Sequence, residues 1–188
     1  MTVALKFVPL KLAAVSPDQA PTLGIIADTH GLLRPEAVPA LNGCHGIIHA
    51  GDLGKLEVCE ALSRIAPTVA IRGNVDRGPW AKRFPETLAV SAGGVNIYVT
   101  HDLKAMTIDP SAEKAHVVIS GHSHHPAITE KLGVLYVNPG SAGPRRFSLP
   151  VTVVRIRIGS DYLQTDLVDL LTGTVVSRVK TARRACST

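Results

Sequence analysis

Cysteine and aromatic residues are both scarce in this chain of 188 residues. The three cysteines, Cys44, Cys59 and Cys186, are odd in number and have no C-x-x-C spacing, so they predict neither a disulfide framework nor a zinc knuckle. A reducing cytoplasm is therefore the expected compartment. Aromatic residues make up 4% of the chain, which leaves little surface for stacking on nucleobases. A nucleic-acid partner is not expected despite a net charge of +5, because the basic residues are scattered.

Uninterrupted apolar runs are also short. The longest near the N-terminus, residues 3–15, is broken by Lys6, Pro9 and Lys11, so we expect neither a membrane span nor a secretory signal. Hydrophobic residues are 45% and charged residues 19% of the chain, the balance of a folded domain. We expect three parts, which are an N-terminal extension over 1–21 (poorly ordered or packed at an edge), a single domain over 22–180 and a polar tail over 181–188.

Apolar segments alternate with helical segments in the first half of the domain. Residues 22–27, 46–50 and 68–71 predict buried parallel strands, and residues 34–41 and 53–65 predict helices between them. Such connections are right-handed, so the carboxyl ends of the strands converge at one edge of a sheet. The second half predicts strands at 87–92, 95–100, 113–120, 127–131, 134–137, 154–158, 162–170 and 174–179. The fold class is therefore α/β.

Polar side chains follow these strands where each one ends. They are, in chain order, Asp28, His30, Asp52, Asn74, His101, His122 and His124. In extended chain, residues two apart point the same way, so His122 and His124 can project to one side. Imidazole is the commonest protein ligand for transition metals. Seven donors are too many for one tetrahedral zinc site and would suit two divalent ions that share Asp52.

The donor chemistry predicts both the metal and the substrate. Nitrogen and oxygen ligands without thiolate favour Mn²⁺, with Zn²⁺, Fe or Ni²⁺ as alternatives. Two ions bring four positive charges and two carboxylates remove two, so the site keeps an excess of about +2 and suits an anion. Two metals about 3.5–4 Å apart can hold a bridging hydroxide that attacks a phosphoester. We therefore expect a small phosphoester as substrate.

Each of these motifs also has an ordinary structural explanation. Asp28 and Asp52 could be helix N-caps, because both follow a strand and precede a helical segment. Gly73-Asn74 could be a turn, and His101 could be a hydrogen-bonded histidine at a strand end. Caps and turns together do not explain four histidines at these positions, so the metal site is favoured.

The remaining histidines are expected to have other roles. We expect His45, His116 and His125 at the surface, and His49 packed behind the acid that ends its strand. Residues 138–141, with Pro139 followed by two small residues, predict a tight turn that shapes a pocket wall.

The motifs, in the order Asp28-x-His30, Gly51-Asp52, Gly73-Asn74, His101 and Gly121-His122-x-His124, resemble the signature of calcineurin-like metallophosphoesterases. The forms of residues 73–76 and 138–141 resemble its small, single-domain YfcE-type phosphodiesterase branch. The resemblance covers residues 22 to about 180 and implies a four-layer α/β/β/α sandwich. It implies one ion held by Asp28, His30, Asp52 and His124, and another held by Asp52, Asn74, His101 and His122. Asp52, Asn74 and His101 would be the catalytic residues.

Two positions depart from the family pattern. Larger members have a histidine directly after Gly-Asn as a general acid or phosphate-binding group, whereas this chain has Val75. Assisted departure of the leaving group is therefore not expected, which favours good leaving groups. After His101, relatives often have Gly-His where this chain has Asp102-Leu103. Asp76 is a candidate for supporting the ligands, and Arg77, with Asn74, for contacting the phosphate.

Three functions are compared. The first is a metal-dependent phosphodiesterase acting through a metal-bridging hydroxide. The second is a non-catalytic scaffold, since the family includes the phosphoesterase-like subunit of retromer; a scaffold would be expected to lose ligands, and this chain keeps all seven. The third is a nuclease acting on short or single-stranded ends, without the extra substrate-gripping domain of such enzymes. A homo-oligomer is left open.

Overall fold

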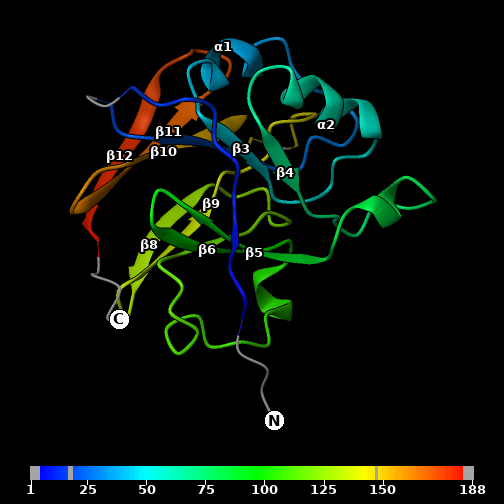
Figure 1. The fold of residues 1–188 in the computed structure, drawn as a ribbon. Helices are drawn as coiled ribbons and strands as arrows, with labels where there is room; N and C mark the ends of the chain where they lie inside the picture. Colours follow the sequence, from blue (N-terminus) through cyan, green and yellow to red (C-terminus); the bar gives the residue numbers. More distant parts are fainter. Residues whose placement is uncertain (1–4, 17–18, 147, 184–188) are drawn as a thin grey trace.

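Two six-stranded sheets stack face to face in the computed structural model, which describes residues 5–16, 19–146 and 148–183 (Figure 1). The upper sheet of Figure 1 runs in the order β12 (Val175–Ala182), β11 (Tyr162–Asp169), β10 (Thr152–Ile158), β2 (Thr22–Ile26), β3 (Gly46–His49) and β4 (Thr68–Ala70). The lower sheet runs in the order β1 (Val8–Pro9), β5 (Thr87–Ala92), β6 (Val95–Thr100), β7 (Val117–Ile119), β9 (Val134–Asn138) and β8 (Ala127–Lys131).

The main core lies between the two sheets. Ile25 and Ile48 enter it from the upper sheet, and Ile97 and Ile119 enter it from the lower sheet; each is 1% exposed or less. Strands β2, β3 and β4 are parallel, as the right-handed connections predict, and all of β2 is buried because both of its faces are covered. This is why the strand reads as a continuous apolar run.

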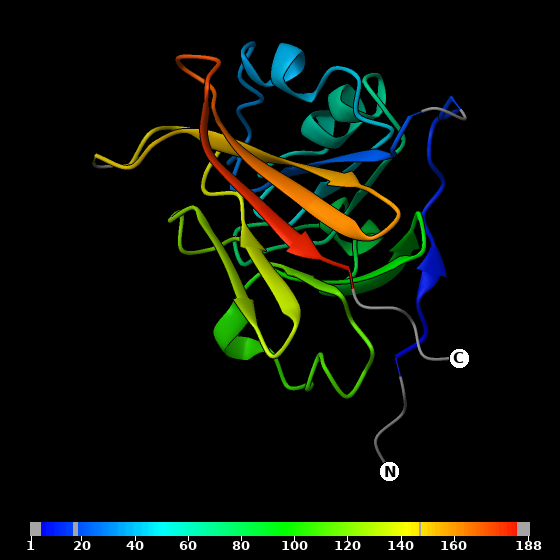
Figure 2. The same cartoon turned by 90° about the vertical axis from the view of Figure 1, so that its left-hand side faces the viewer.

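Two helices, α1 (Ala37–Leu41) and α2 (Leu56–Ser63), cover the outer face of the upper sheet (Figure 2). Leu41 and Leu62 are fully buried in the cluster beneath them. Both helices begin about three residues later than predicted. For α2 the reason is that the backbone before it is already bonded: the carbonyl of Leu53 accepts from Gly31 and the N–H of Gly54 donates to Asp76.

Irregular chain covers the outer face of the lower sheet in the described part of the molecule. The short 3₁₀ helix η2 (Leu103–Ala105) and the turns that follow it lie there, below the sheet in Figure 2. Phe7 and Ile108 pack on Tyr98 and Val118 of the sheet. The predicted α/β sandwich is therefore confirmed, with its fourth layer made of turns. The strand predicted over 113–120 is shortened to β7 because its first residues belong to one of these turns.

The segments at the two ends of the chain join the sheets. Strand β1 pairs in parallel with β5, Leu10 is buried in the main core, and the N–H of Ala13 donates to His45 at 2.7 Å. This part of the N-terminal extension therefore packs at an edge. Strand β12 pairs with β11 as far as Ala182, two residues into the predicted tail. Residues 184–188, which include Cys186, lie outside the described residues.

Two histidines expected at the surface are not exposed. His116 is 9% exposed, and its Nδ1 accepts the backbone N–H of Asn96 at 2.9 Å. His45 is half-buried, and its Nδ1 accepts the N–H of Thr22 at 3.1 Å. The prediction was wrong for His116, and in both histidines the ring accepts a backbone N–H near the start of a strand. His125 is exposed as predicted. No helix in the described residues is long and apolar enough to cross a membrane.

Candidate metal centre

All seven predicted ligand residues lie where strands of the two sheets end. The upper sheet supplies Asp28 and His30 after β2, Asp52 after β3 and Asn74 after β4, while the lower sheet supplies His101 after β6 and His122 and His124 after β7. Strands β6 and β7 are parallel, like the three strands above them, so carboxyl ends from both sheets meet in one place.

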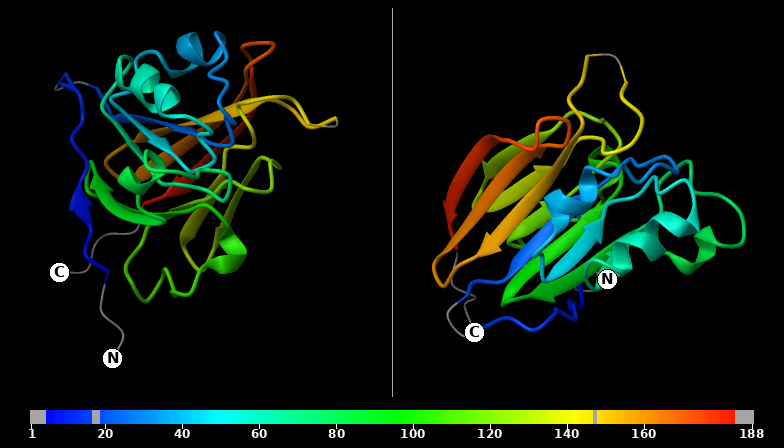
Figure 3. Two further views of the ribbon diagram at one scale, coloured as in Figure 1. Left: turned by 90° about the vertical axis from the view of Figure 1, so that its right-hand side faces the viewer. Right: turned by 90° about the horizontal axis from the view of Figure 1, so that it is seen from above.

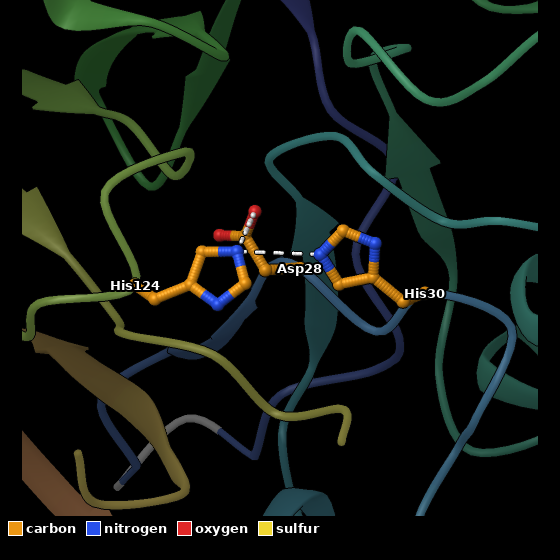
Figure 4. Close-up of side chains that lie close together, drawn as sticks. All are labelled: Asp28, His30 and His124. Carbon is orange, nitrogen blue, oxygen red and sulfur yellow. Dashed lines mark hydrogen bonds and ion pairs between the residues drawn. The ribbon is translucent and has the colours of Figure 1, made fainter. Parts of the chain in front are cut away.

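One group of donors consists of Asp28, His30 and His124 (Figure 4). His124 Nε2 lies 3.4 Å from Asp28 Oδ1 and 3.3 Å from His30 Nε2. Asp28 is fully buried and His124 is 6% exposed. The three ligand atoms lie within 4.8 Å of one another, a separation that one metal ion can bridge.

A second group of donors lies beside the first. His101 Nε2 is 3.1 Å from Asn74 Oδ1, and His122 Nδ1 is 3.2 Å from the same oxygen. Asp52 joins the two groups: its Oδ1 is 3.4 Å from His101 Nε2, and its Oδ2 is 3.8 Å from His30 Nε2. Asp28, Asp52 and His101 also offer ligand atoms within 4.8 Å of one another, so the groups overlap at the carboxylates. These contacts are compatible with the two ligand sets that the family resemblance implied.

The second group fits a cation because the atoms that it offers to a metal are all hydrogen-bond acceptors and face one another. The Nδ1 of His101 lies 2.8 Å from the carbonyl oxygen of Ala50 and donates to it, which fixes the ring tautomer. In the neutral ring, the lone pair of Nε2 then faces the carboxylate of Asp52 and the amide oxygen of Asn74. Three lone pairs in this arrangement repel one another unless a positive charge lies between them.

Asp52 and His101 shift each other's pKa in opposite directions. Burial alone would raise the pKa of Asp52, but its contact with His101 and the N–H of Val75 hold the pKa below its ordinary value. Burial alone would lower the pKa of His101, but Asp52 and the carbonyl of Ala50 raise it. A metal binds the neutral imidazole, so metal binding competes with protonation of His101.

The first group is buried in a form that also suits a cation. Burial raises the pKa of Asp28 to about 7, and burial together with the nearby Arg146 lowers the pKa of His124 to about 4. A neutral imidazole has a free lone pair for a metal, and a divalent ion would compensate the charge of the buried carboxylate. The donor set therefore fits a divalent metal.

The backbone at the site is held in an uncommon conformation. Five of the ligand residues have positive φ, between 46° and 66°; they are Asp28, His30, Asp52, His122 and His124. This region costs a residue with a side chain roughly 1–2 kcal/mol. Such outliers gather at functional sites, where the surrounding structure holds them in place.

A buried carboxylate that is not a ligand holds these loops. Asp76, 6% exposed, accepts the N–H groups of Leu53, Gly54 and Gly73 at 2.7–3.1 Å. Asp76 thereby connects the loop that carries Asp52 to the loop that carries Asn74. The supporting role predicted for Asp76 agrees with these contacts.

Residues 138–141 connect the loops of both sheets. They form the predicted turn, with the N–H of Gly140 donating to Asn138 Oδ1. Asn138 Nδ2 also donates to the carbonyl of Gly121 at 2.7 Å, and the Ser141 hydroxyl donates to the carbonyl of Asp28 at 2.9 Å. The turn therefore fixes the backbone beside two groups of ligands as well as shaping a pocket wall.

Helix capping does not explain the two aspartates. The N-cap of α2 is Lys55, which makes no side-chain capping bond, and Asp52 Oδ1 instead accepts the N–H of Val75 at 3.0 Å. Asp28 accepts the N–H of His122 at 3.0 Å, across to the other sheet. Both carboxylates are thus used to join loops around the site.

One arginine beside the donors was not predicted. Arg146 Nη2 lies 3.4 Å from His30 Nε2, on the loop that projects from the sandwich (Figure 3, yellow). The predicted Arg77 is exposed, and its Nε contacts the carbonyl of Asn74 at 3.4 Å rather than a donor atom of the site. The Pro144-Arg145-Arg146 run directly after the 138–141 turn was the signal that could have indicated it.

Acid should destabilise the metal-free protein through His49. This imidazole is fully buried, accepts the N–H of Gly51 at Nδ1 and donates from Nε2 to the Thr29 hydroxyl at 3.0 Å. Burial lowers its pKa to about 3, so between pH 6.5 and 3 the unfolded chain binds a proton that the folded chain does not. This contribution to stability is present above pH 6.5 and is lost as pH falls, by about 1.4 kcal/mol per unit.

The measurement is the free energy of unfolding in urea between pH 6.5 and 4.5, with the metal removed. His49→Asn keeps an acceptor for Gly51 but cannot be protonated in this range. We expect the variant to be less stable at pH 6.5 and to show the shallower pH dependence. Equal slopes for the two proteins would contradict the prediction.

Comparison with known proteins identifies the class. The calcineurin-like phosphoesterase superfamily domain matches residues 22–161. The chain therefore belongs to the calcineurin-like phosphoesterase superfamily, as its motifs suggested. A probable metallophosphoesterase from Methanothermobacter thermautotrophicus is 31% identical over 173 residues, which cover 86% of this chain and 99% of that protein.

Two solved structures show the same fold. The phosphoesterase Yfce from E. coli aligns with a TM-score of 0.63 and 19% identity, over 84% of this chain and 98% of its own. Vacuolar Protein Sorting 29 from Cryptosporidium parvum aligns with a TM-score of 0.75 and 19% identity, over 88% of this chain and 100% of its own. At these identities the likeness concerns the fold, and function must be argued from the site.

Proposed function

We propose that this protein is a metal-dependent phosphodiesterase that hydrolyses small phosphoesters at a two-metal site. The observation that carries the proposal is the position of Asp52, whose two oxygens face different histidines, His30 and His101. Two divalent ions held there would lower the pKa of bound water and neutralise the phosphoryl oxygens. Mn²⁺ is the metal we favour, because the donors are nitrogen and oxygen without thiolate.

The residues of this chain would bind and orient the substrate. Asn74 and His122 lie on the open side of the site, where a phosphate can approach, while Asp28 and Asp52 are buried behind them. Val75 is 40% exposed at the position where larger relatives have a histidine, and its side chain cannot donate a proton. The proposal therefore predicts faster hydrolysis of diesters with good leaving groups than of those with poor ones.

The test is hydrolysis of bis-p-nitrophenyl phosphate and of p-nitrophenyl phosphate. Protein stripped of metal should be inactive and should regain diester turnover when refilled with Mn²⁺, Zn²⁺ or Fe²⁺. Turnover that survives metal removal would rule out the mechanism. Folded, metal-loaded protein that hydrolyses neither ester under any condition would favour the scaffold function instead.

The scaffold remains the second candidate because the fold is shared with Vacuolar Protein Sorting 29. The metal centre argues against a scaffold. Seven donor residues gather there, and five of them have a positive φ, a backbone conformation that is unfavourable for residues with a side chain. A protein that used only its surface for contacts would have no need of them. A small phosphoester partner, a cytoplasmic location and a homo-oligomer stay predictions.

Arg146 should bind the substrate phosphate. A guanidinium beside two metal ions is repelled unless an anion lies between them, and a phosphate there would accept charge-assisted hydrogen bonds. We expect Arg146→Ala to raise the KM for bis-p-nitrophenyl phosphate by about tenfold, from a loss of about 1.5 kcal/mol. Metal content should stay unchanged.

The neighbouring arginine provides a matched control for this prediction. Arg145 is exposed on the same loop, and its Nε contacts the carbonyl of Leu149 at 3.3 Å. Arg145→Ala should leave the KM within about twofold of the wild type, since a solvated surface charge contributes little. If Arg77→Ala raised the KM and Arg146→Ala did not, the phosphate contact would belong to Arg77, as the sequence predicted.

A further inference from the structure

Two cavities open on either side of His122 and Asp102, and both residues line each of them. The larger cavity has a volume of about 540 Å³ and the smaller about 340 Å³. Asn74 and His101 also line the smaller one. The donor group of the lower sheet therefore faces two spaces, of which one extends away from the metal ligands.

The larger cavity has more space than a phosphate group needs, and part of its wall is apolar. Its apolar walls include the side chains of Leu103 and Ala127 and the ring of Tyr136, contributed by η2, β8 and β9. Its polar lining includes Lys104 and His125. Its volume lies within the range of small-molecule sites, about 300–1,000 Å³, which are mostly apolar with a few polar groups. It is shaped for an organic group.

The smaller cavity has less apolar wall, and Ala105 is the one wholly apolar side chain among its described lining residues. Arg72, Glu86 and Thr87 contribute polar groups, and Arg72 Nη2 forms an ion pair with Glu86 Oε1 at 2.7 Å. An apolar ring placed there would remove these charged groups from water without replacing their hydrogen bonds. An aromatic group attached to a phosphate at the metal site is therefore better placed in the larger cavity.

We propose that the larger cavity binds an aromatic group esterified to the substrate phosphate, with Tyr136 contacting the ring. The assignment rests on the proposed function, because it needs the phosphate at the metal site. It makes the preferred substrate a diester with one planar, apolar arm, such as an aryl or nucleoside group. Offset or edge contact with Tyr136 and burial of the ring would both favour this arm over an alkyl arm.

The test uses two non-hydrolysable anions that differ only in the arm, phenylphosphonate and methylphosphonate. Their binding to the Mn²⁺-loaded protein can be measured by calorimetry without any turnover. We expect the wild type to bind phenylphosphonate about tenfold more tightly, as expected for partial burial of a phenyl ring.

Matched variants on β8 locate the effect. Thr129 lines the larger cavity, whereas Lys131, two residues along on the same face, does not. Thr129→Phe should fill the cavity and reduce the preference for phenylphosphonate to about twofold or less. Lys131→Phe should keep the wild-type preference. Unchanged binding of methylphosphonate shows that the metal site of each variant is intact.

Each result bears on one assignment. A wild type that binds both phosphonates equally, or a Thr129→Phe protein that matches Lys131→Phe, would overturn the cavity assignment. If phenylphosphonate is preferred but bis-p-nitrophenyl phosphate is not hydrolysed, the proposed function fails while the cavity assignment stands. If neither phosphonate binds, both fail.

Discussion

Asp52→Asn should reduce hydrolysis of bis-p-nitrophenyl phosphate by roughly a thousandfold or more. The carboxylate is 3% exposed, and its oxygens face His101 on one side and His30 on the other. An amide cannot supply a charged oxygen to both sides, so the variant would lose the shared ligand of the pair. A thousandfold loss of rate corresponds to about 4 kcal/mol of transition-state stabilisation, which the metal site would supply.

The measurements are turnover and metal content per chain after equilibration with Mn²⁺. Asp109→Asn serves as the matched control. Asp109 lies in an exposed turn, and its Oδ1 accepts the N–H of Ser111, which an asparagine can also do. This variant should keep the wild-type turnover and metal content. If Asp52→Asn kept its full metal content and wild-type turnover, Asp52 would not be a required metal ligand and the prediction would be wrong.

Gly73→Ala should be nearly as damaging, although this residue has no functional group. A Cβ at this position would overlap Asp52 Oδ1 and would lie 2.5 Å from the backbone nitrogen of Asp52 and 2.8 Å from its Cγ. Because these atoms belong to the shared ligand and to its backbone, the loop must shift. A displacement of about 1 Å at a reacting centre can reduce the rate about a hundredfold, and we expect at least that.

Gly173→Ala is the control for this substitution. That glycine, in the turn between β11 and β12, has φ +69°, and a methyl group added to it would have no atom of the described residues within 4 Å. The change should cost stability by about 1 kcal/mol and leave turnover unaffected. Gly73→Ala with wild-type turnover and metal content would mean that the loop carrying Asp52 tolerates displacement, contrary to the contacts described.

The ligand residues could be predicted because the chemistry of the site limits the choice. A nitrogen and oxygen donor set requires histidines, carboxylates and amides, and parallel strands joined by helices place them directly after the strands. The glycine before Asp52 is required by the structure, because Gly51 has φ +93° and a Cβ there would lie 2.6 Å from Nδ1 of His101.

The failed predictions concern long-range contacts. Arg146 contacts His30, which is 116 positions away in the sequence. The basic run over 144–146 marks the loop, but it does not indicate which residue the arginine contacts. His116 is buried, and its ring accepts a hydrogen bond from the backbone N–H of Asn96, 20 positions away. Helix α2 begins late because Asp76, 22 positions from Gly54, takes the N–H that a longer helix would leave free.

The kinds of donors, their order and the strands before them can all be read along the chain, because each depends on a residue and its immediate neighbours. The contacts between donors of different sheets cannot, because they depend on how one sheet is stacked on the other. His122 meets Asn74 and His124 meets Asp28 only when β7 of the lower sheet ends beside β2 and β4 of the upper one. Packing of the two apolar sheet faces against each other sets that position, and it does so through side chains far from the site.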